Sequence, residues 1–551
     1  MRKSVHACVI GAGACGLTAA ATLREYGIRV TVFEENHWVG GVWKYDSRTD
    51  ADAGGRGVHS SMYKGLRTNL PREVMGYVGF PFTADNTAYE SEDERRFPLH
   101  AEVQKYLEAY AREHGLTRES GVLRTGCRVL RAEPTTRPLS SASSSSSSLG
   151  GAGNNGNGNA LHDDNDERPP SPTSTLPQTR WTVHIEVQDE AALSASASAS
   201  ASASAAAATG EGAGETRLEE LHFDAIVCCN GHYRIPNYPE VEGLYDTFKG
   251  IVMHSHDYRE PSRFEGMRVV VVGHANSGDD ISREIAEVAE AVFVCAHRSE
   301  AEMSTLDTAY GPRANIYKTR MLRKLDAEST GHTDGDMDIT KASKPTVMEK
   351  IDAVVICTGY KYDFPFLSSD VVGVDDSRVL DVYRHIFLPS HLSPSLSFVG
   401  LPWKVIPLPL AQMQAHYIAQ LLLGVLALPD PDAMRAELEK YYSRLDELVG
   451  AKSRRYTHRF DMSVGNGQFE YSNTLAKTCG LENVTRFEKG AWMQQLYEAA
   501  SAARRGVSGR SGSYRDNDVA FEDINALVED AMRTERPPKI PAARIAASEE
   551  S

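Results

Sequence analysis

Two separate stretches of the chain each combine an apolar strand, a glycine turn and the start of a helix. The first is Ala7–Gly16, and the second is Arg268–Ile281, with the sequence RVVVVGHANSGDDI. In such a corner the helix N-terminus offers free N–H groups and a partial positive charge to a pyrophosphate. Two corners in one polypeptide predict two dinucleotide sites, and therefore two cofactors that must meet.

The first corner matches the pattern G-x-G-x-x-G directly after a strand. Apolar residues then recur at helical spacing, and the next strand, Arg29–Phe33, ends on Glu34. An acid about 20 residues past the glycines accepts hydrogen bonds from ribose hydroxyls and repels a 2′-phosphate. We therefore expect FAD or NAD rather than NADP at this site. The glycine turn comprises Gly11, Ala12, Gly13, Ala14, Cys15 and Gly16.

The second corner differs at two positions. A helix is expected over Ser277–Glu290 and a strand over Ala291–Ala296, but the ribose position then lacks an acid and offers Arg298. A guanidinium can grip a 2′-phosphate bidentately, so this site should prefer NADPH. Ala275 stands where the second glycine would be, and its methyl group narrows the approach to the pyrophosphate, although Ser277 and Gly278 can still serve the helix start.

A short internal repeat brackets the second corner. Asp224–Gly231 and Asp352–Gly359 are each an apolar strand that ends in a polar residue and a glycine. The simplest topology has the chain leave the first domain after Gly231, build the second domain and return at Asp352. We therefore predict an α/β fold with two Rossmann-like dinucleotide-binding domains, the NADPH domain being inserted into the FAD domain across a two-stranded hinge. The expected divisions are residues 1–235 (FAD-binding domain, first part), 236–351 (NADPH-binding domain), 352–429 (FAD-binding domain, return segment) and 430–551 (helical C-terminal region with a polar tail).

Three short strands predict an antiparallel meander within the first domain: Cys127–Ala132, Trp181–Val187 and Leu218–Phe223. Between them lie residues 134–178, rich in Ser, Gly, Asn and Pro, and residues 191–214, an Ala-Ser repeat. Neither stretch has enough apolar content to offset the entropy of ordering it. Long insertions at hairpin tips also cost little stability. We expect both inserts to be disordered and to lack a catalytic role.

Charge and cysteine usage exclude several classes of protein. The formal net charge of −16 argues against nucleic acid or an anionic membrane as the main partner. The eight cysteines form no C-x-x-C pair and no metal-like cluster with histidine, which favours reduced thiols in an intracellular protein. Val5–Ile10 is already a strand, which argues against a secretory leader, and the apolar run Tyr417–Leu428 is too short to span a bilayer. These features predict a soluble, cytoplasmic protein with no transmembrane segment and no metal.

The stretch Phe248–Tyr258 fits F-x-G-x-x-x-H-x-x-x-Y and lies between the two corners. This arrangement resembles the identifying pattern of flavin-containing monooxygenases, and the resemblance runs to roughly Asp523 apart from the two inserts. It includes Gly40–Trp43 and Leu66–Glu73. Other stretches look closest to the plant S-oxygenating branch, including the glucosinolate-type enzymes; they are Ala275–Gly278 and Arg454–His458.

The resemblance implies a mechanism in which NADPH transfers a hydride to FAD, O₂ adds to the reduced ring, and a flavin C4a-hydroperoxide forms. The sulfur or nitrogen of a small substrate then attacks the distal oxygen. The reactive power belongs to the cofactor, so the protein positions the rings and excludes water. By resemblance Asn69 lies beside the flavin and the nicotinamide and stabilises the peroxide. The resemblance further assigns FAD to Gly11 through Gly16, Glu34, Val42, Trp43, Thr68, Asn69 and Leu70, and NADPH to Ser277, Gly278, Asp279, Asp280 and Arg298.

Several alternatives compete with this interpretation. A Baeyer–Villiger monooxygenase carries Trp with Pro or Asp after the linker histidine, whereas this chain has Tyr258-Arg259. An auxin-pathway type, which oxidises a 2-oxo acid, stays open. A flavin disulfide reductase would need a redox-active C-x-x-C pair or its equivalent. A non-catalytic flavoprotein that binds a partner through its acidic C-terminal tail also stays open. For His254 we favour a structural or gating role in the linker.

Overall fold

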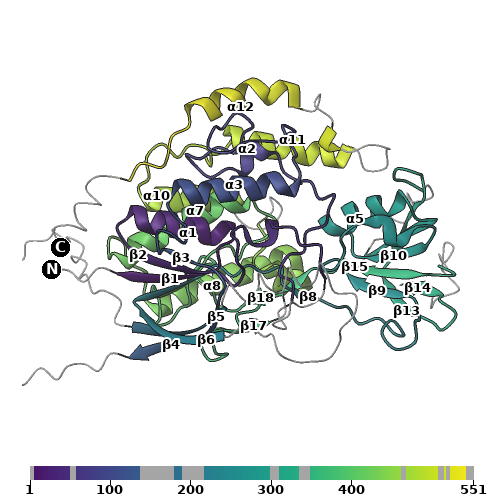
Figure 1. Ribbon diagram of the computed structural model, residues 1–551, viewed down its shortest axis with the longest axis horizontal. Helices are drawn as coiled ribbons and strands as arrows, with labels where there is room; N and C mark the ends of the chain where they lie inside the picture. The colour runs from purple at the N-terminus through teal and green to yellow at the C-terminus, as the bar shows by residue number, and fades with distance from the viewer. Residues whose placement is uncertain are drawn as a thin grey trace, which may run out of the picture.

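A computed structural model describes most of the chain and shows two parallel sheets at opposite ends of the molecule, with helices stacked over the first (Figure 1). Arg298 lies outside the described residues, as does most of both predicted inserts. The described residues are 5–49, 57–136, 179–188, 216–297, 309–333, 348–375, 377–460, 467–506, 514–516 and 521–540.

The first sheet has the strand order β19-β7-β1-β2-β3, and its neighbouring strands pair in parallel. Alternate side chains of a strand point to opposite faces. Val9 therefore packs under the helices, whereas Cys8 and Ile10 pack against the meander. The strands are β1 (His6–Ile10), β2 (Arg29–Phe33), β3 (Leu123–Arg124), β7 (Ala225–Cys228) and β19 (Leu396–Phe398), and the covering helices include α1 (Ala14–Glu25), α3 (His100–Glu113) and α7 (Pro407–Leu422).

The predicted antiparallel meander is confirmed beneath the first sheet. It comprises β4 (Cys127–Thr136), β5 (Thr179–Gln188) and β6 (Thr216–Phe223). The predicted start of the first insert near residue 134 is too early, because β4 continues to pair with β5 as far as Thr136 opposite Thr179. The rest of that insert and the whole of the second lie outside the described residues.

The second sheet has the order β12-β11-β10-β15-β9, and α5 packs on it. Its strands are also parallel. A small antiparallel pair of β13 (Leu322–Leu325) and β14 (Gly331–Thr333) lies beside it. The elements are β9 (Ile251–His254), β10 (Arg268–Val272), α5 (Asn276–Ala286), β11 (Ala291–Ala296), β12 (Ile316–Arg320) and β15 (Ala353–Ile356).

The prediction that the chain returns to the first domain at Asp352 is wrong. The strand that follows, β15, pairs with β10 inside the second sheet, and the first sheet is completed by β19. The repeat has another cause: β7 lies beside β1 as β15 lies beside β10, so the two copies are equivalent strands of two similar domains. The boundary between the predicted second and third segments therefore falls after β15.

The two chain segments that connect the sheets run side by side. β8 (Ile235–Pro236), on the way out, pairs antiparallel with β16 (Tyr360–Lys361), on the way back. A further short pair, β17 (Val374–Asp375) and β18 (Arg378–Val379), precedes the return to β19. The crossing between domains is thus a paired, two-segment connection.

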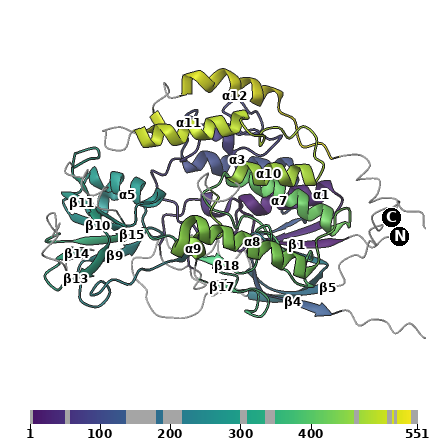
Figure 2. The ribbon, with the colours of Figure 1, turned by 180° about the vertical axis from the view of Figure 1, so that it is seen from behind.

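The region after residue 430 is helical, as predicted. Asp430 caps α8 by accepting hydrogen bonds from the backbone N–H groups of Asp432 and Ala433. Seen from behind, α11 and α12 lie over the helices of the first domain, and one end of α11 is directed toward α5 (Figure 2). The elements are α8 (Pro431–Val449), α9 (Ser453–Tyr456), α10 (Gly467–Thr478), α11 (Trp492–Gly506), η4 (Tyr514–Asp516) and α12 (Glu522–Thr534).

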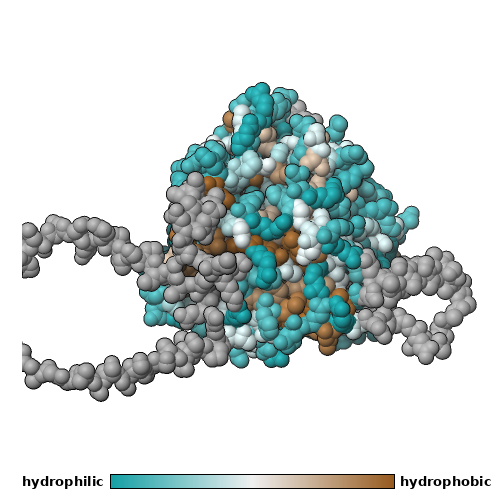
Figure 3. Space-filling view, turned by 60° about the vertical axis from the view of Figure 1, so that its left-hand side comes forward, coloured by the Kyte–Doolittle hydropathy of each residue, from teal (hydrophilic) through white to brown (hydrophobic). Residues whose placement is uncertain are grey.

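The surface is largely polar where it can be seen. Figure 3 shows hydrophilic residues over much of one face, with hydrophobic residues gathered in patches near its centre. Within the described ranges, every helix is too short or too polar to cross a bilayer.

Trp181 anchors the meander to the first sheet and provides a test of this packing. Its side chain is 0% exposed, and its indole N–H donates to Ser395 Oγ at 3.1 Å. We expect Trp181→Ala to lower the free energy of unfolding by about 3–5 kcal/mol, because it leaves a cavity and removes one hydrogen bond to Ser395 Oγ. Leu218→Ala is the matched control, since Leu218 is 71% exposed on β6, and it should change stability by less than about 0.5 kcal/mol. Chemical denaturation followed by circular dichroism measures both values; equal losses would contradict the packing.

Candidate functional site

The first glycine turn closes because the backbone of α1 sits directly against β1 and β7. Gly11 has a φ of +101°, and a Cβ there would lie 2.6 Å from the carbonyl oxygen of Cys229. A Cβ on Gly16 would lie 1.9 Å from the carbonyl oxygen of Gly11. Only glycine fits either position. No side chain of the described residues caps α1, so the first N–H groups of this helix can face an anion.

The segment that carries Val42 and Trp43 folds onto this turn. Gly40 N–H donates to the carbonyl oxygen of Ala12 at 2.9 Å, and the short helix η1 (Gly41–Trp43) follows. A Cβ on Gly13 would stand 3.5 Å from the Cα of Gly41, so the two backbones form a narrow cradle at the start of α1. The structure therefore brings together the FAD-binding residues predicted in the two segments.

Ala14 and Cys15, two further residues of the turn, contact other parts of the protein. Ala14, the first residue of α1, accepts a hydrogen bond from the Tyr77 hydroxyl at 2.7 Å. Burial raises the pKa of Cys15 to about 12, and a Cβ on Gly400 would lie 2.4 Å from its sulfur. An undissociated thiol in such close contact fills space rather than reacts.

Glu34 is buried beside the turn at the end of β2. Its Oε2 accepts the N–H of Ala12 at 2.7 Å, and its Oε1 accepts both the backbone and the side-chain N–H of Asn36 at 2.9 Å. Burial raises the pKa of Glu34, and these hydrogen bonds act in the opposite direction. The carboxylate thus supports the turn, and it retains acceptor capacity for the predicted ribose contact.

The loop that contains Thr68, Asn69 and Leu70 is fixed at its backbone and carries one buried hydroxyl that nothing in the described structure satisfies. Thr68 is 2% exposed, and its hydroxyl has no hydrogen-bond partner among the described residues. Its backbone is fixed, because its N–H donates to Pro98 and its carbonyl accepts from Arg515 Nε at 2.9 Å. An orphaned buried hydroxyl is a group that a bound molecule would satisfy. Partly buried Leu70 packs on the core of the first domain.

The second corner repeats the packing of the first. Gly273 has a φ of +105°, and a Cβ there would lie 2.4 Å from the carbonyl oxygen of Cys357. A Cβ on Gly278 would lie 2.0 Å from the carbonyl oxygen of Gly273. Ala275 occupies the N-cap of α5 with a φ of −90°, a conformation open to any residue. The departure from the glycine fingerprint therefore strains nothing. Ser277 lies in the first turn of α5, whose start has no side-chain cap in the described structure.

Asp279 and Asp280 are held by arginines from the C-terminal region. Asp280 Oδ2 lies 2.6 Å from Arg515 Nη2, and Asp279 Oδ2 lies 3.7 Å from Arg504 Nη2. The structure thus shows both carboxylates as anchoring points of α5, and their contact with NADPH stays a prediction. The contact predicted for Arg298 also stays a prediction, because that residue lies outside the described part of the chain.

His254, in the linker motif, is buried and engaged at both ring nitrogens. Its Nδ1 accepts the backbone N–H of His256 at 3.1 Å, so Nε2 carries the proton and donates to the carbonyl oxygen of Gly359 at 3.1 Å. Burial lowers the pKa of His254 to about 4, which keeps the ring neutral near pH 7. These contacts tie the end of β9 to the segment after β15 and support a structural role.

Sequence reasoning missed two residues that hold α5, namely Glu284, bonded within the second domain, and Arg515, which also contacts the first domain. Tyr258 donates a hydrogen bond to Glu284 Oε2 at 2.8 Å, and burial raises the pKa of Glu284 to about 7. Arg515 contacts both domains, as described above. The family pattern includes Tyr258, but Glu284 and Arg515 carry no local signal, since their partners are distant in sequence.

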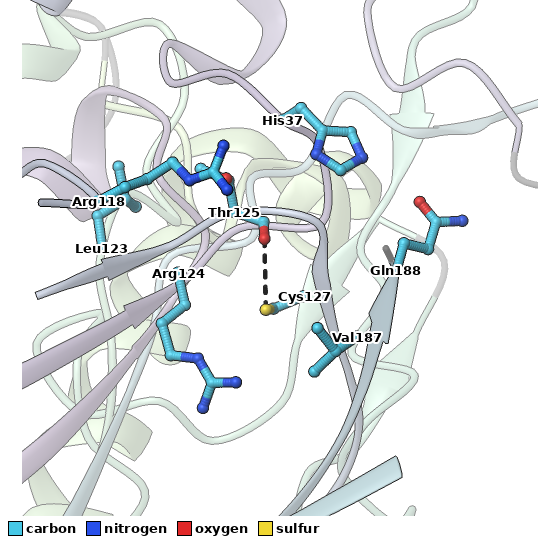
Figure 4. A pocket seen from close by; sticks show the side chains of 8 residues that line it. All are labelled: His37, Arg118, Leu123, Arg124, Thr125, Cys127, Val187 and Gln188. Atoms are coloured by element: carbon cyan, nitrogen blue, oxygen red, sulfur yellow. Dashed lines mark hydrogen bonds between the residues drawn. The ribbon is translucent and has the colours of Figure 1, made fainter. Parts of the chain in front are cut away.

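Sequence reasoning also missed a pocket of about 330 Å³ at the edge of the first sheet (Figure 4). It lies next to Glu34, whose carbonyl accepts the N–H of Cys127 at 2.8 Å, but no predicted cofactor residue lines it. Its lining residues are His37, Arg118, Leu123, Arg124, Thr125, Cys127, Val187 and Gln188.

With this geometry established, similarity to known proteins identifies the family. The flavin-binding monooxygenase-like family matches residues 3–134, 194–331 and 339–464, which together exceed half of the chain. Flavin-containing monooxygenase FMO GS-OX-like 4 of Arabidopsis thaliana is 34% identical over 520 residues, covering 93% of this chain and 94% of that protein. FMO GS-OX2 of Arabidopsis thaliana is 34% identical over 535 residues, covering 96% and 94%.

Solved structures agree with these relatives. S-allyl-L-cysteine S-oxygenase from Allium sativum superposes with a TM-score of 0.71 at 31% identity and covers 96% of this chain and 99% of its own. Tmm from Pelagibacter sp. strain HTCC7211, with a TM-score of 0.63 at 18% identity, shares the fold. The predicted two-domain α/β fold and the predicted cofactor pair are confirmed. The chain is an FAD- and NADPH-dependent monooxygenase and belongs to the flavin-binding monooxygenase-like family.

Proposed function

We propose that this monooxygenase transfers one oxygen atom from O₂ to the sulfur of a small molecule. The observation that carries the proposal is the likeness, over nearly the whole chain, to an enzyme whose name states sulfur oxygenation of S-allyl-L-cysteine. The sequence alone allowed sulfur or nitrogen, and this likeness favours sulfur. The branch-specific stretches Ala275–Gly278 and Arg454–His458 point the same way. We further propose a cytoplasmic location, which agrees with eight free cysteines, seven of them buried.

FAD fits the first corner. The uncapped start of α1 and the cradle between Gly13 and Gly41 would receive the pyrophosphate, and Glu34 would accept a ribose hydroxyl. Trp43 lies on the segment that folds onto this turn, and the Thr68 hydroxyl has no partner among the described residues. FAD supplies the oxygen-activating chemistry when bound, so the protein has to hold and orient it and keep water away.

NADPH fits the second corner. The uncapped start of α5, with Ser277 and Gly278, would receive its pyrophosphate. Arg298 would bind the 2′-phosphate bidentately. NADH lacks this phosphate and cannot make the contact, so the site would prefer NADPH. The Ala275 conformation is compatible with this binding, because the turn needs glycine only at Gly273 and Gly278.

Asn69 would act at the reacting oxygen. A side-chain amide offers two donors and one acceptor without changing charge, which suits an atom that gains negative charge during the reaction. Thr68, its neighbour, is fixed by backbone hydrogen bonds on both sides, so Asn69 is carried on a rigid loop. Positioning of this kind needs no reorganisation when charge develops.

The proposed activity predicts a defined product stoichiometry. The holoenzyme is incubated with NADPH, O₂ and S-allyl-L-cysteine, and separately with a tertiary amine, a cyclic ketone and a 2-oxo acid. We expect about one S-oxide for each NADPH consumed, with less product from the other three compounds. Chromatography with mass spectrometry measures the products, and a peroxidase assay measures hydrogen peroxide. The proposal would be overturned if the enzyme released hydrogen peroxide and formed no oxygenated product with any of the four compounds.

Asn69→Asp tests the role of the amide. The substitution keeps the shape but removes the N–H donors and adds a negative charge, so product formation should fall about 10- to 100-fold while bound FAD is unchanged. Asn483→Asp is the control, because Asn483 is an exposed residue outside the proposed site. Flavin absorbance measures FAD content, and S-oxide yield measures the reaction. An unchanged yield in Asn69→Asp would remove Asn69 from its proposed role.

Arg298→Ala tests the cofactor preference. Loss of a bidentate contact to the 2′-phosphate should raise the KM for NADPH by about 10-fold or more and leave the KM for NADH unchanged. Arg313→Ala provides the control, since Arg313 is an exposed residue of the same domain. Initial rates of cofactor oxidation at varied concentrations give both values. An equal rise for both cofactors would reject the contact.

A further inference from the structure

The C-terminal region reaches the junction between the two domains at three charged residues. These residues, which we name the C-terminal clasp, are Arg504 at the end of α11 and Arg515 and Asp516 in η4. Arg504 Nη1 donates to Asn276 Oδ1 at 2.8 Å, at the first residue of α5. Figure 2 shows α11 directed toward α5, in agreement with this contact. The clasp therefore links a late segment of the chain to the second corner.

Arg515 contacts both domains with one guanidinium group. Its Nη2 donates to Asp280 Oδ2 on α5 at 2.6 Å, and its Nε donates to the carbonyl oxygen of Thr68 in the first domain at 2.9 Å. The Arg515 and Asp280 side chains are 13% and 15% exposed. A charged pair so well shielded from water is screened by salt less than a surface pair. One planar side chain thus fixes the distance between the Thr68 carbonyl and the start of α5.

A second arginine holds the clasp from the opposite side. Arg67 Nη1 donates to Asp516 Oδ1 at 2.6 Å, and Arg67 Nη2 donates to the carbonyl oxygen of Arg515 at 3.4 Å. Arg67 is itself fixed, because its Nε donates to the carbonyl oxygen of Phe97 at 2.8 Å. The backbone and the side chain of Arg515 are therefore both held against the loop that precedes Asn69.

The position of these contacts gives them a consequence for the reaction. Thr68 immediately precedes Asn69, and Asp280 directly follows the first turn of α5, the helix of the second corner. The domains are otherwise connected by the short β8–β16 pair and by contacts such as Tyr63 with Asp280, whose oxygens lie 3.5 Å apart. Hydride transfer requires the two cofactors to meet at a defined distance, and small misplacements are costly.

We infer that Arg515 is a positioning residue that holds the Asn69 loop and helix α5 in register, so that NADPH can reduce the flavin. The inference rests on the proposed placement of the two cofactors. Arginine suits this task because its Nε and Nη2 present two donors in a fixed plane, one for each domain. A lysine could keep one of the two contacts but not both.

The first test measures flavin reduction in the holoenzyme. NADPH is mixed with the protein without O₂, and loss of flavin absorbance gives the reduction rate. We expect Arg515→Ala to slow reduction about 10-fold at saturating NADPH with FAD content unchanged, and Arg515→Lys to recover part of the rate. Asp280→Asn should slow flavin reduction less than Arg515→Ala does. The double variant should slow reduction by less than the product of the two single effects, because both substitutions remove the same contact. Arg533→Ala is the control, because Arg533 is a 77% exposed side chain paired with Asp530 on α12.

The second test needs no cofactor. Hydrogen exchange of the cofactor-free protein should become faster in both the Tyr63–Leu70 loop and α5 when Arg515 is replaced by alanine, and unchanged in Arg533→Ala. Wild-type reduction rates in Arg515→Ala, or faster exchange confined to η4, would overturn the inference. A wild-type protein that neither oxidises NADPH nor forms an S-oxide, yet shows the coupled exchange, would instead overturn the proposed function.

Discussion

The close backbone contact at the two glycine corners is the constraint on which the rest of the structure depends. In each corner the last glycine of the turn packs on the carbonyl of the first, at a distance that leaves no room for a Cβ. The helix must therefore start directly above the ends of the strands, with its N–H groups turned toward the edge where ligands bind in parallel sheets. Because the arrangement occurs twice in one chain, the protein presents two helix starts of the kind that suits a pyrophosphate, one in each domain.

Features that depend on local pattern could be predicted from the sequence. The glycine turns, the first parallel strands and the alternating Trp181, Val183 and Ile185 of the meander all follow from short-range spacing. The point at which the chain returns to the first sheet could not be predicted. β7 and β15 have the same sequence pattern, and a pattern does not identify the sheet that a strand joins. The true return strand, β19, spans only Leu396–Phe398 and carries no periodic signal. Strand neighbours are a long-range property, and here two equivalent strands were mistaken for an exit and a return.

The candidate site likewise contains residues that a local pattern predicts and residues that only the tertiary structure reveals. Gly11, Gly16, Gly273 and Gly278 are fixed by motif, and their packing explains the motif. Thr68, Asn69 and Leu70 were reached through resemblance, since a loop of that composition has no physical signature of its own; the unpaired Thr68 hydroxyl supplies one only in three dimensions. Arg515 was missed because its partner, Asp280, lies 235 residues away. A lone arginine in a polar segment is normally a solvated side chain, and only the tertiary contact distinguishes it.

The acidic start of α5 shows why the C-terminal region belongs to the site. Asp279 lies in the first turn of α5, where a carboxylate is favoured by the helix dipole, and Asp280 follows it directly. The same position is proposed to receive the pyrophosphate of NADPH, and two unpaired carboxylates there would repel it. Arg504 and Arg515 approach these acids from the C-terminal region and offset their charge. The helix thus keeps an acid that stabilises its first turn and still presents N–H groups to an anion. On the proposed placement of NADPH, residues more than two hundred positions from the glycine turn therefore join Arg283, 3.5 Å from Asp279, in making the second corner electrostatically fit for its cofactor.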